Sequence, residues 1–257
     1  MRSQRPPLVI TLVLALALMG SLATNLWLFQ LGAQYYYELN QTRLDPLGLG
    51  AFEGQAIPED TASPSVLVFF GDSRAAEWPA PDLAGVQVIN RSIGGQTTAQ
   101  ALGRFATHVA PLHPRLIVIQ VGINDLKTIP LFPDRRNQLV ATCLKNITEI
   151  VRQARQTGAL VVLTTIIPAG EPSLTRRLYW SDDVAPAVAE VNMALRALEG
   201  PDVVVLDAAT LLGNEQGQLR DEYRRDTLHM TPKGYTVLNA ALAEILQGWE
   251  VEHMSAR

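Results

Sequence analysis

The amino-acid sequence predicts an α/β protein, in which a parallel β-sheet carries helices on both faces, preceded by a membrane-targeting segment. Short runs rich in β-branched and aromatic residues alternate with helical patterns from residue 66 to residue 247, as is typical of such a sheet. The clearest run, 66–70 (VLVFF), ends in Gly71-Asp72-Ser73. Near the N-terminus, residues 8–29 include no charged side chain.

The expected elements follow from hydrophobic periodicity and from the glycines and prolines between them. Strands are expected at 66–70, 86–90, 116–121, 160–166 and 203–206. The links are helices at about 97–108, 135–156, 184–198 and 234–247, each with apolar residues at helical spacing. Right-handed crossovers favour the flavodoxin-like strand order 2-1-3-4-5.

The charge, cysteine and histidine content indicates which partners and cofactors to expect. The 257 residues include 21 Lys and Arg against 25 Asp and Glu, a net charge of −4 without blocks of like charge, so no nucleic-acid partner is expected. Cys143 is the single cysteine, and it falls on the apolar stripe of a predicted helix. The four histidines are scattered, so we expect no metal and no cofactor.

The N-terminus has two interpretations, and both export the rest of the chain. Residues 1–7 carry two arginines and no acid, and the run 8–29 is long enough to cross about 30 Å of hydrocarbon. A cleaved signal peptide is supported by the small residues of Ser21-Leu22-Ala23. An uncleaved anchor is favoured, because apolar character continues to residue 29 and aromatic residues follow at 35–37.

These patterns divide the chain into four parts. Residues 1–30 are the anchor or signal segment, 31–64 a tether punctuated by proline and glycine, 65–248 the folded domain, and 249–257 a tail. The domain is expected outside the cytoplasm, tethered to the membrane, or secreted if the first segment is cleaved.

Polar groups suited to acyl transfer follow three predicted strands and one late turn. Ser73 follows the first strand, at the sheet edge where ligands bind in open α/β sheets, and is the candidate nucleophile. A Gly-Gly pair ending in Gly95 follows the second strand, and Asn124 follows the third. The turn Asp226-Thr-Leu-His229 comes near the end.

These four blocks resemble the SGNH, or GDSL-like, hydrolases. Ser73, Gly95, Asn124 and His229 match the Ser, Gly, Asn and His blocks in the family's order. The resemblance implies the flavodoxin-like sheet and an esterase or acylhydrolase activity. Arg74 is a local departure, since the family more often has an apolar or small residue there.

The residue types suggest a role for each group. His229 would be the general base for Ser73, and Asp226, three residues earlier, would orient its ring. The oxyanion would be stabilised by the backbone N–H groups of Ser73 and Gly95 and by the side-chain amide of Asn124. Their neighbours Asp72 and Asp125 are expected to tie the loops through hydrogen bonds to backbone N–H groups.

The sequence therefore predicts a serine esterase that acts through an acyl-enzyme on a small ester or on an acylated lipid or glycan. Two alternatives stay open: an acyltransferase that passes the acyl group to a glycan hydroxyl, and a non-catalytic binding module on the same scaffold. Specificity is expected in loop 168–183, where four large apolar residues could line an acyl site and Arg176 or Arg177 could meet an anion.

Overall fold

The computed structural model describes residues 8–55, 65–81, 83 and 85–254, with side chains up to Gly248. The basic start at 1–7, the second part of the expected tether at 56–64 and the end of the tail at 255–257 lie outside the described residues. The chain divides into two compact units, Met1–Pro46 and Leu47–Arg257.

The second unit is built on a parallel sheet with the predicted strand order. Among the described residues five strands form this sheet in the order β2-β1-β3-β4-β5. They are β1 (Ser65–Gly71), β2 (Val86–Asn90), β3 (Leu116–Gln120), β4 (Leu160–Thr164) and β5 (Val203–Leu206). β1 pairs with β2 on one side and β3 on the other, so the residues that follow these three strands leave the sheet side by side.

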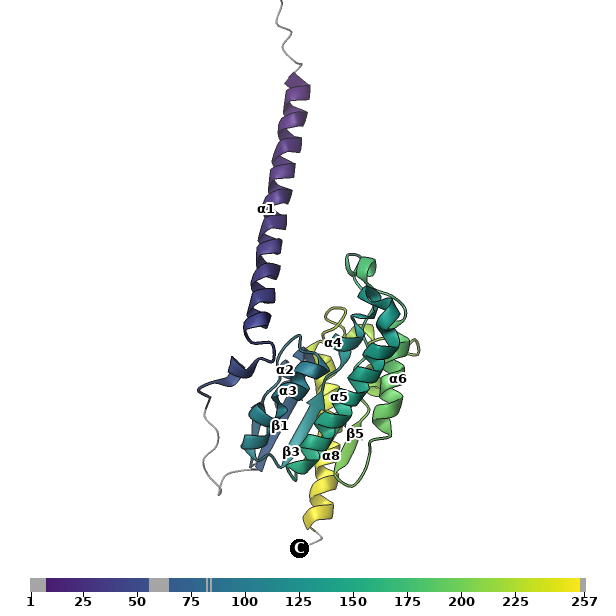
Figure 1. Cartoon of the computed structure of the whole chain (residues 1–257). Helices are drawn as coiled ribbons and strands as arrows, with labels where there is room; N and C mark the ends of the chain where they lie inside the picture. Colours follow the sequence, from purple (N-terminus) through teal and green to yellow (C-terminus); the bar gives the residue numbers. More distant parts are fainter. Residues whose placement is uncertain (1–7, 56–64, 82, 84, 255–257) are drawn as a thin grey trace, which may run out of the picture. The chain divides into compact units, whose positions relative to one another are not determined.

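Helices cover both faces of the sheet, as the alternating pattern predicts. On one face lie α3 (Thr98–His108), α5 (Arg136–Gln156) and α6 (Val184–Arg196), packed on alternate strand residues such as Phe70 and Ile119. On the other lie α7 (Ala208–Leu212) and α8 (Pro232–Met254), packed on Phe69 and Val118. Figure 1 shows α3 and α5 in front of the strands and α8 behind them.

Cys143 lies on the buried side of α5 and is fully enclosed by the core. Burial raises the pKa of its thiol well above the ordinary value, so the thiolate is disfavoured. This confirms the prediction that Cys143 is a packing residue.

The described part of the first unit consists mainly of one long helix. α1 spans Leu8–Leu44, 37 residues, and none of its side chains is buried. It is long and apolar enough to cross a membrane. At 1.5 Å per residue it measures about 55 Å, more than the roughly 30 Å that hydrocarbon requires. Its extent differs from the expected boundary at residue 30, because residues 31–44 continue the helix rather than forming an irregular tether.

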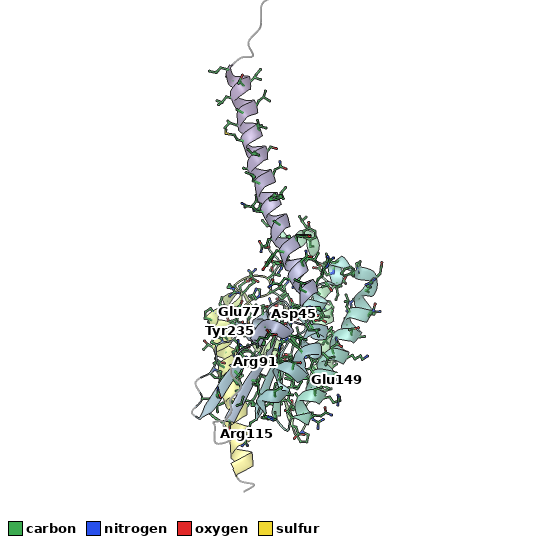
Figure 2. The ribbon with its side chains drawn as sticks, turned by 60° about the vertical axis from the view of Figure 1, so that its left-hand side comes forward. Asp45, Glu77, Arg91, Arg115, Glu149 and Tyr235 are labelled. Atoms are coloured by element: carbon green, nitrogen blue, oxygen red, sulfur yellow. The ribbon has the colours of Figure 1, made fainter. Side chains whose placement is uncertain are left out.

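The residues after Pro46 belong to the folded domain. Leu47–Gln55 (hereafter the leading segment) includes a short 3-10 helix, Leu49–Phe52, and packs on α3 and the loop before it. Within it the Phe52 ring meets the His108 ring edge to face at 5.0 Å, and the Arg91 guanidinium, labelled in Figure 2, lies 4.7 Å from the Phe52 centroid. These contacts explain why this part of the expected tether is ordered on the domain.

Candidate active site

Ser73 lies where β1 gives way to a short helix, α2 (Ser73–Ala76). The helix begins here because the Asp72 side chain caps it, accepting a hydrogen bond from the Arg74 N–H at 2.9 Å. Asp72 therefore ties the loop as predicted. The Ser73 side chain remains partly accessible, while Asp72 and Arg74 on either side are fully buried.

Ser73, His229 and Asp226 form a continuous chain of polar contacts. Ser73 Oγ lies 3.0 Å from His229 Nε2, and His229 Nδ1 lies 2.8 Å from Asp226 Oδ2. The imidazole thus lies between the hydroxyl and the carboxylate, although 156 residues separate Ser73 from His229. This geometry lets the ring take a proton from the hydroxyl while the carboxylate fixes the tautomer.

The Asp226–His229 turn holds its own carboxylate in the ionised form. Asp226 Oδ1 accepts the backbone N–H of Leu228 at 2.7 Å and that of His229 at 2.9 Å. Partial burial opposes ionisation, but these backbone bonds and the His229 ring outweigh it and lower the pKa of Asp226 to about 2. Near neutral pH the carboxylate is therefore charged and oriented toward the ring.

The loop after β2 passes close to the nucleophile at Gly94, the neighbour of Gly95. A Cβ built on Gly94 would lie 3.8 Å from the Ser73 Cβ, so this part of the loop lies against Ser73. Gly95 has φ 75°, a left-handed conformation that other residues adopt only with strain. This backbone conformation explains why a glycine is needed at position 95, independently of the motif.

Asn124 lies in α4 (Ile123–Leu126), directly after the end of β3, and is nearly fully buried. Its side-chain amide donates one hydrogen bond to the Gln96 carbonyl oxygen at 3.0 Å, one residue beyond Gly95. An asparagine amide carries two donor hydrogens, so the second remains for another acceptor. This bond joins α4 to the loop that contains Gly95, the two segments on which the expected donors lie.

Two residues that the motif reasoning missed hold the Gly95 loop. Gln96 and Arg104 are buried, and the Arg104 Nε donates to Gln96 Oε1, while its terminal nitrogens donate to the carbonyl oxygens of Arg91 and Gly71. A sequence signal for Arg104 does exist, since it falls on the buried stripe of α3 beside Phe105. An arginine on an apolar stripe indicates a buried set of acceptors.

Asp125, in α4, fixes the start of α3. Its carboxylate accepts the Thr98 N–H at 2.9 Å and the Thr98 hydroxyl at 2.6 Å. Burial raises the pKa of Asp125, and the two Thr98 bonds oppose that rise. The predicted structural role of Asp125 is confirmed.

The expected specificity loop has a mixed environment. Leu174, Leu178 and Tyr179 are exposed, whereas Trp180 packs against the core. Within this loop Arg177 forms an ion pair with Glu171. The apolar side chains are thus available at the surface, and Trp180 has a packing role.

Two other histidines, His108 and His113, make contacts or lie at positions apart from Ser73. His108 Nε2 lies 3.0 Å from the Leu49 carbonyl oxygen in the leading segment, and His113 lies in the loop that enters β3 at the opposite end of the sheet. Within the described part of the chain, no group of three or more His, Cys, Asp and Glu residues could hold a metal ion.

Comparisons with known proteins agree with this fold. A family model, the GDSL-like lipase/acylhydrolase family, matches residues 61–237. The uncharacterized lipoprotein YqeF of Bacillus subtilis (strain 168) is 28% identical over 131 residues, 44% of this chain and 53% of the relative. The match therefore spans about half the length of that curated relative.

Solved structures are similar over most of the domain. A candidate acylhydrolase from Bacteroides fragilis has a TM-score of 0.66 and 25% identity, covering 79% of this chain and 98% of that one. A lipase/acylhydrolase from Enterococcus faecalis has a TM-score of 0.54 and 25% identity, covering 72% and 96%. An acetylxylan esterase mutant from Geobacillus stearothermophilus has the same fold, with a TM-score of 0.51 and 16% identity over 71% and 94%. The family match over more than half of the chain shows that this protein belongs to the GDSL-like lipase/acylhydrolase family.

Proposed function

We propose that this protein is an exported serine esterase, anchored in a membrane by α1, that cleaves a carboxylic ester through an acyl-enzyme on Ser73. The observation that carries the proposal is the chain of contacts from Ser73 Oγ through the His229 ring to the Asp226 carboxylate, at 3.0 and 2.8 Å. Family membership supports the hydrolase class, and the residue roles come from the geometry of this chain.

In the first half-reaction Ser73 Oγ attacks the ester carbonyl carbon while His229 Nε2 removes the hydroxyl proton. The developing oxyanion takes hydrogen bonds from the backbone N–H groups of Ser73 and Gly95 and from the free amide hydrogen of Asn124. The imidazolium then gives its proton to the alcohol, which leaves, and the acyl group stays on Ser73.

In the second half-reaction His229 removes a proton from water, and the resulting nucleophile attacks the acyl-enzyme carbonyl. Collapse of the tetrahedral intermediate returns the proton to Ser73 Oγ and releases a carboxylic acid. Asp226 stabilises the imidazolium in both halves without taking the proton itself. No step requires a group beyond these side chains, backbone N–H groups and water.

The test combines labelling with turnover of p-nitrophenyl esters of increasing chain length by the full chain in mild detergent. A fluorophosphonate should label the wild type at Ser73 and should not label Ser73→Ala. Ser73→Ala and His229→Ala should each remove nearly all esterase activity, and the double variant should be hardly worse than either, because the pair moves one proton. Asp226→Asn should be milder, since the base is still present.

The outcomes separate the remaining alternatives. A folded wild type that is neither labelled nor active on any ester would contradict the proposal and favour a binding module. A wild type that is labelled but releases its acyl group only to an added sugar would favour an acyltransferase.

A further inference from the structure

Arg74 is a fully buried arginine directly after Ser73. Its Nε donates to the Leu228 carbonyl oxygen at 2.6 Å, and its terminal nitrogens donate to the carbonyl oxygens of Ile167 and Pro168. The Tyr235 hydroxyl, labelled in Figure 2, donates to the Arg74 carbonyl oxygen at 3.0 Å. One guanidinium therefore joins α2 to the loop after β4 and to the turn that carries the base.

The contact with Leu228 acts on the peptide group that precedes His229. The carbonyl oxygen of this group accepts from Arg74, and its N–H, which belongs to His229, donates to Asp226 Oδ1. A peptide group is planar, so holding both of its edges fixes its orientation. The direction in which the His229 side chain leaves the backbone is then fixed as well.

We propose that Arg74 is a positioning residue that sets the place of the His229 imidazole relative to Ser73 Oγ. The inference rests on the proposed function, in which His229 is the base for Ser73. Because Arg74 follows Ser73 in the chain, the nucleophile and the base are linked through one side chain and one peptide group. Arg74, which departs from the family pattern, thus helps to hold the active site in place.

The shape of the guanidinium suits this task better than a lysine ammonium would. It presents donors in a rigid planar fork, which reaches carbonyl oxygens of two separate segments at once. Burial lowers the pKa of Arg74 to about 10, and the nearby Asp72 opposes this, so the side chain stays charged near neutral pH. Hydrogen bonds from a charged donor are stronger than neutral ones.

A second link between the same two elements offers a matched control. Glu77, the residue that caps the end of α2, forms an ion pair with Arg225 at 3.0 Å, just before the Asp226–His229 turn. Both side chains are substantially exposed, and an exposed ion pair contributes little to structure. Breaking this pair removes a contact between α2 and the turn without touching the peptide group before His229.

The experiment measures fluorophosphonate labelling and ester turnover for the full chain carrying Arg74→Lys, Arg74→Met or Glu77→Gln. Leu195→Ala, a cavity in the fully buried core of α6, controls for lost stability alone. The labelling end point counts active sites, and the labelling rate constant reports how well each site activates its serine. Molecules that have lost their fold irreversibly do not label, so they lower the end point but not the rate constant.

For Arg74→Lys we expect a normal end point, a labelling rate constant and kcat at least about 10-fold lower, and a nearly unchanged KM, since small misplacement of a base costs rate rather than binding. Arg74→Met should be slower still. Glu77→Gln should match the wild type, and Leu195→Ala should lower the end point at most.

The inference is overturned if the Arg74→Lys molecules that label do so at the wild-type rate, because Arg74 would then support the fold alone. If Arg74→Met does not fold, the labelling rate of Arg74→Lys alone tests the inference. A wild type that fails to label overturns the proposed function and this inference with it, whereas a labelled wild type with an unchanged Arg74→Lys removes this inference only.

Discussion

Asp72 carries a buried charge whose cost can be measured as a function of pH. Its carboxyl is fully buried, with Oδ1 accepting the Arg74 N–H and Oδ2 without a partner among the described residues. Burial raises the pKa of Asp72 from 3.8 to about 6, even though the charge of Arg74 opposes the rise. The folded protein therefore holds this proton more tightly than the unfolded chain does.

The sign of the effect follows from this difference. The contribution of Asp72 to the free energy of unfolding is fully present only well below the unfolded pKa of 3.8, at about pH 3, where both states are protonated, and is lost as the pH rises through about 6. A pKa raised by this amount corresponds to about 3 kcal/mol. The wild type should lose this much on going from about pH 3 to about pH 8, beyond the pH dependence that its other groups produce.

Asp72→Asn isolates this term, because the amide oxygen can still accept the Arg74 N–H and the amide does not titrate in this range. Free energies of unfolding come from urea titrations of the full chain in mild detergent, followed by tryptophan fluorescence, at both pH values. At the higher pH, the free energy of unfolding of the variant minus that of the wild type should be about 3 kcal/mol larger than at the lower pH. Effects of the substitution that do not depend on pH cancel in this comparison.

The exposed substitution Asp134→Asn, which changes net charge equally, serves as the control. If the free energies of unfolding of Asp72→Asn and the wild type differ by the same amount at both pH values, the reasoning is refuted, because Asp72 would then have the same affinity for its proton in the folded and unfolded states.

Three further predictions follow from other features. Asn124→Ala should lower kcat by about 100-fold or more with KM and stability nearly unchanged, since the donor acts mainly in the transition state; an unaffected kcat on a turned-over ester would make Asn124 a loop residue only. Gly71→Ala should prevent folding, because its Cβ would lie 1.7 Å from the Gln120 carbonyl oxygen, whereas Gly200→Ala, with open space, should give a wild-type urea midpoint. The full chain should stay with membranes after carbonate extraction through α1, and recovery of a soluble chain starting near residue 24 would contradict the anchor.

Most of the fold could be predicted because its signals are local. Each strand is a short apolar run, and the predicted and observed boundaries differ by two residues or fewer, as for β4, expected to end at residue 166 and observed to end at Thr164. The strand order followed from the handedness of crossovers and is confirmed. Strand ends then placed Ser73, Gly95 and Asn124 on one edge of the sheet.

The supporting network could not be predicted, because its partners are distant in sequence and are backbone atoms. Arg74 bonds carbonyl oxygens 93 to 154 residues away, and no residue pattern marks a carbonyl as an acceptor. The same holds for Gln96, whose amide donates to the Leu47 carbonyl oxygen across 49 residues. Proline and glycine in 46–54 suggested a tether lying on or above the domain, but no residue pattern specified which of its residues contact the domain.

Because the leading segment, Leu47–Gln55, packs on the domain, the functional domain begins at Leu47 rather than at the first strand. Gln96, the residue after Gly95, donates to the Leu47 carbonyl oxygen at 2.8 Å. A Cβ on Gly48 would lie 2.9 Å from Ile93 in the same loop, so the fit is close. A truncation at the first strand would remove this support from the Gly95 loop and uncover apolar surface on α3. Soluble forms of the domain, whether engineered or released by a protease, should therefore keep Leu47 to remain fully active.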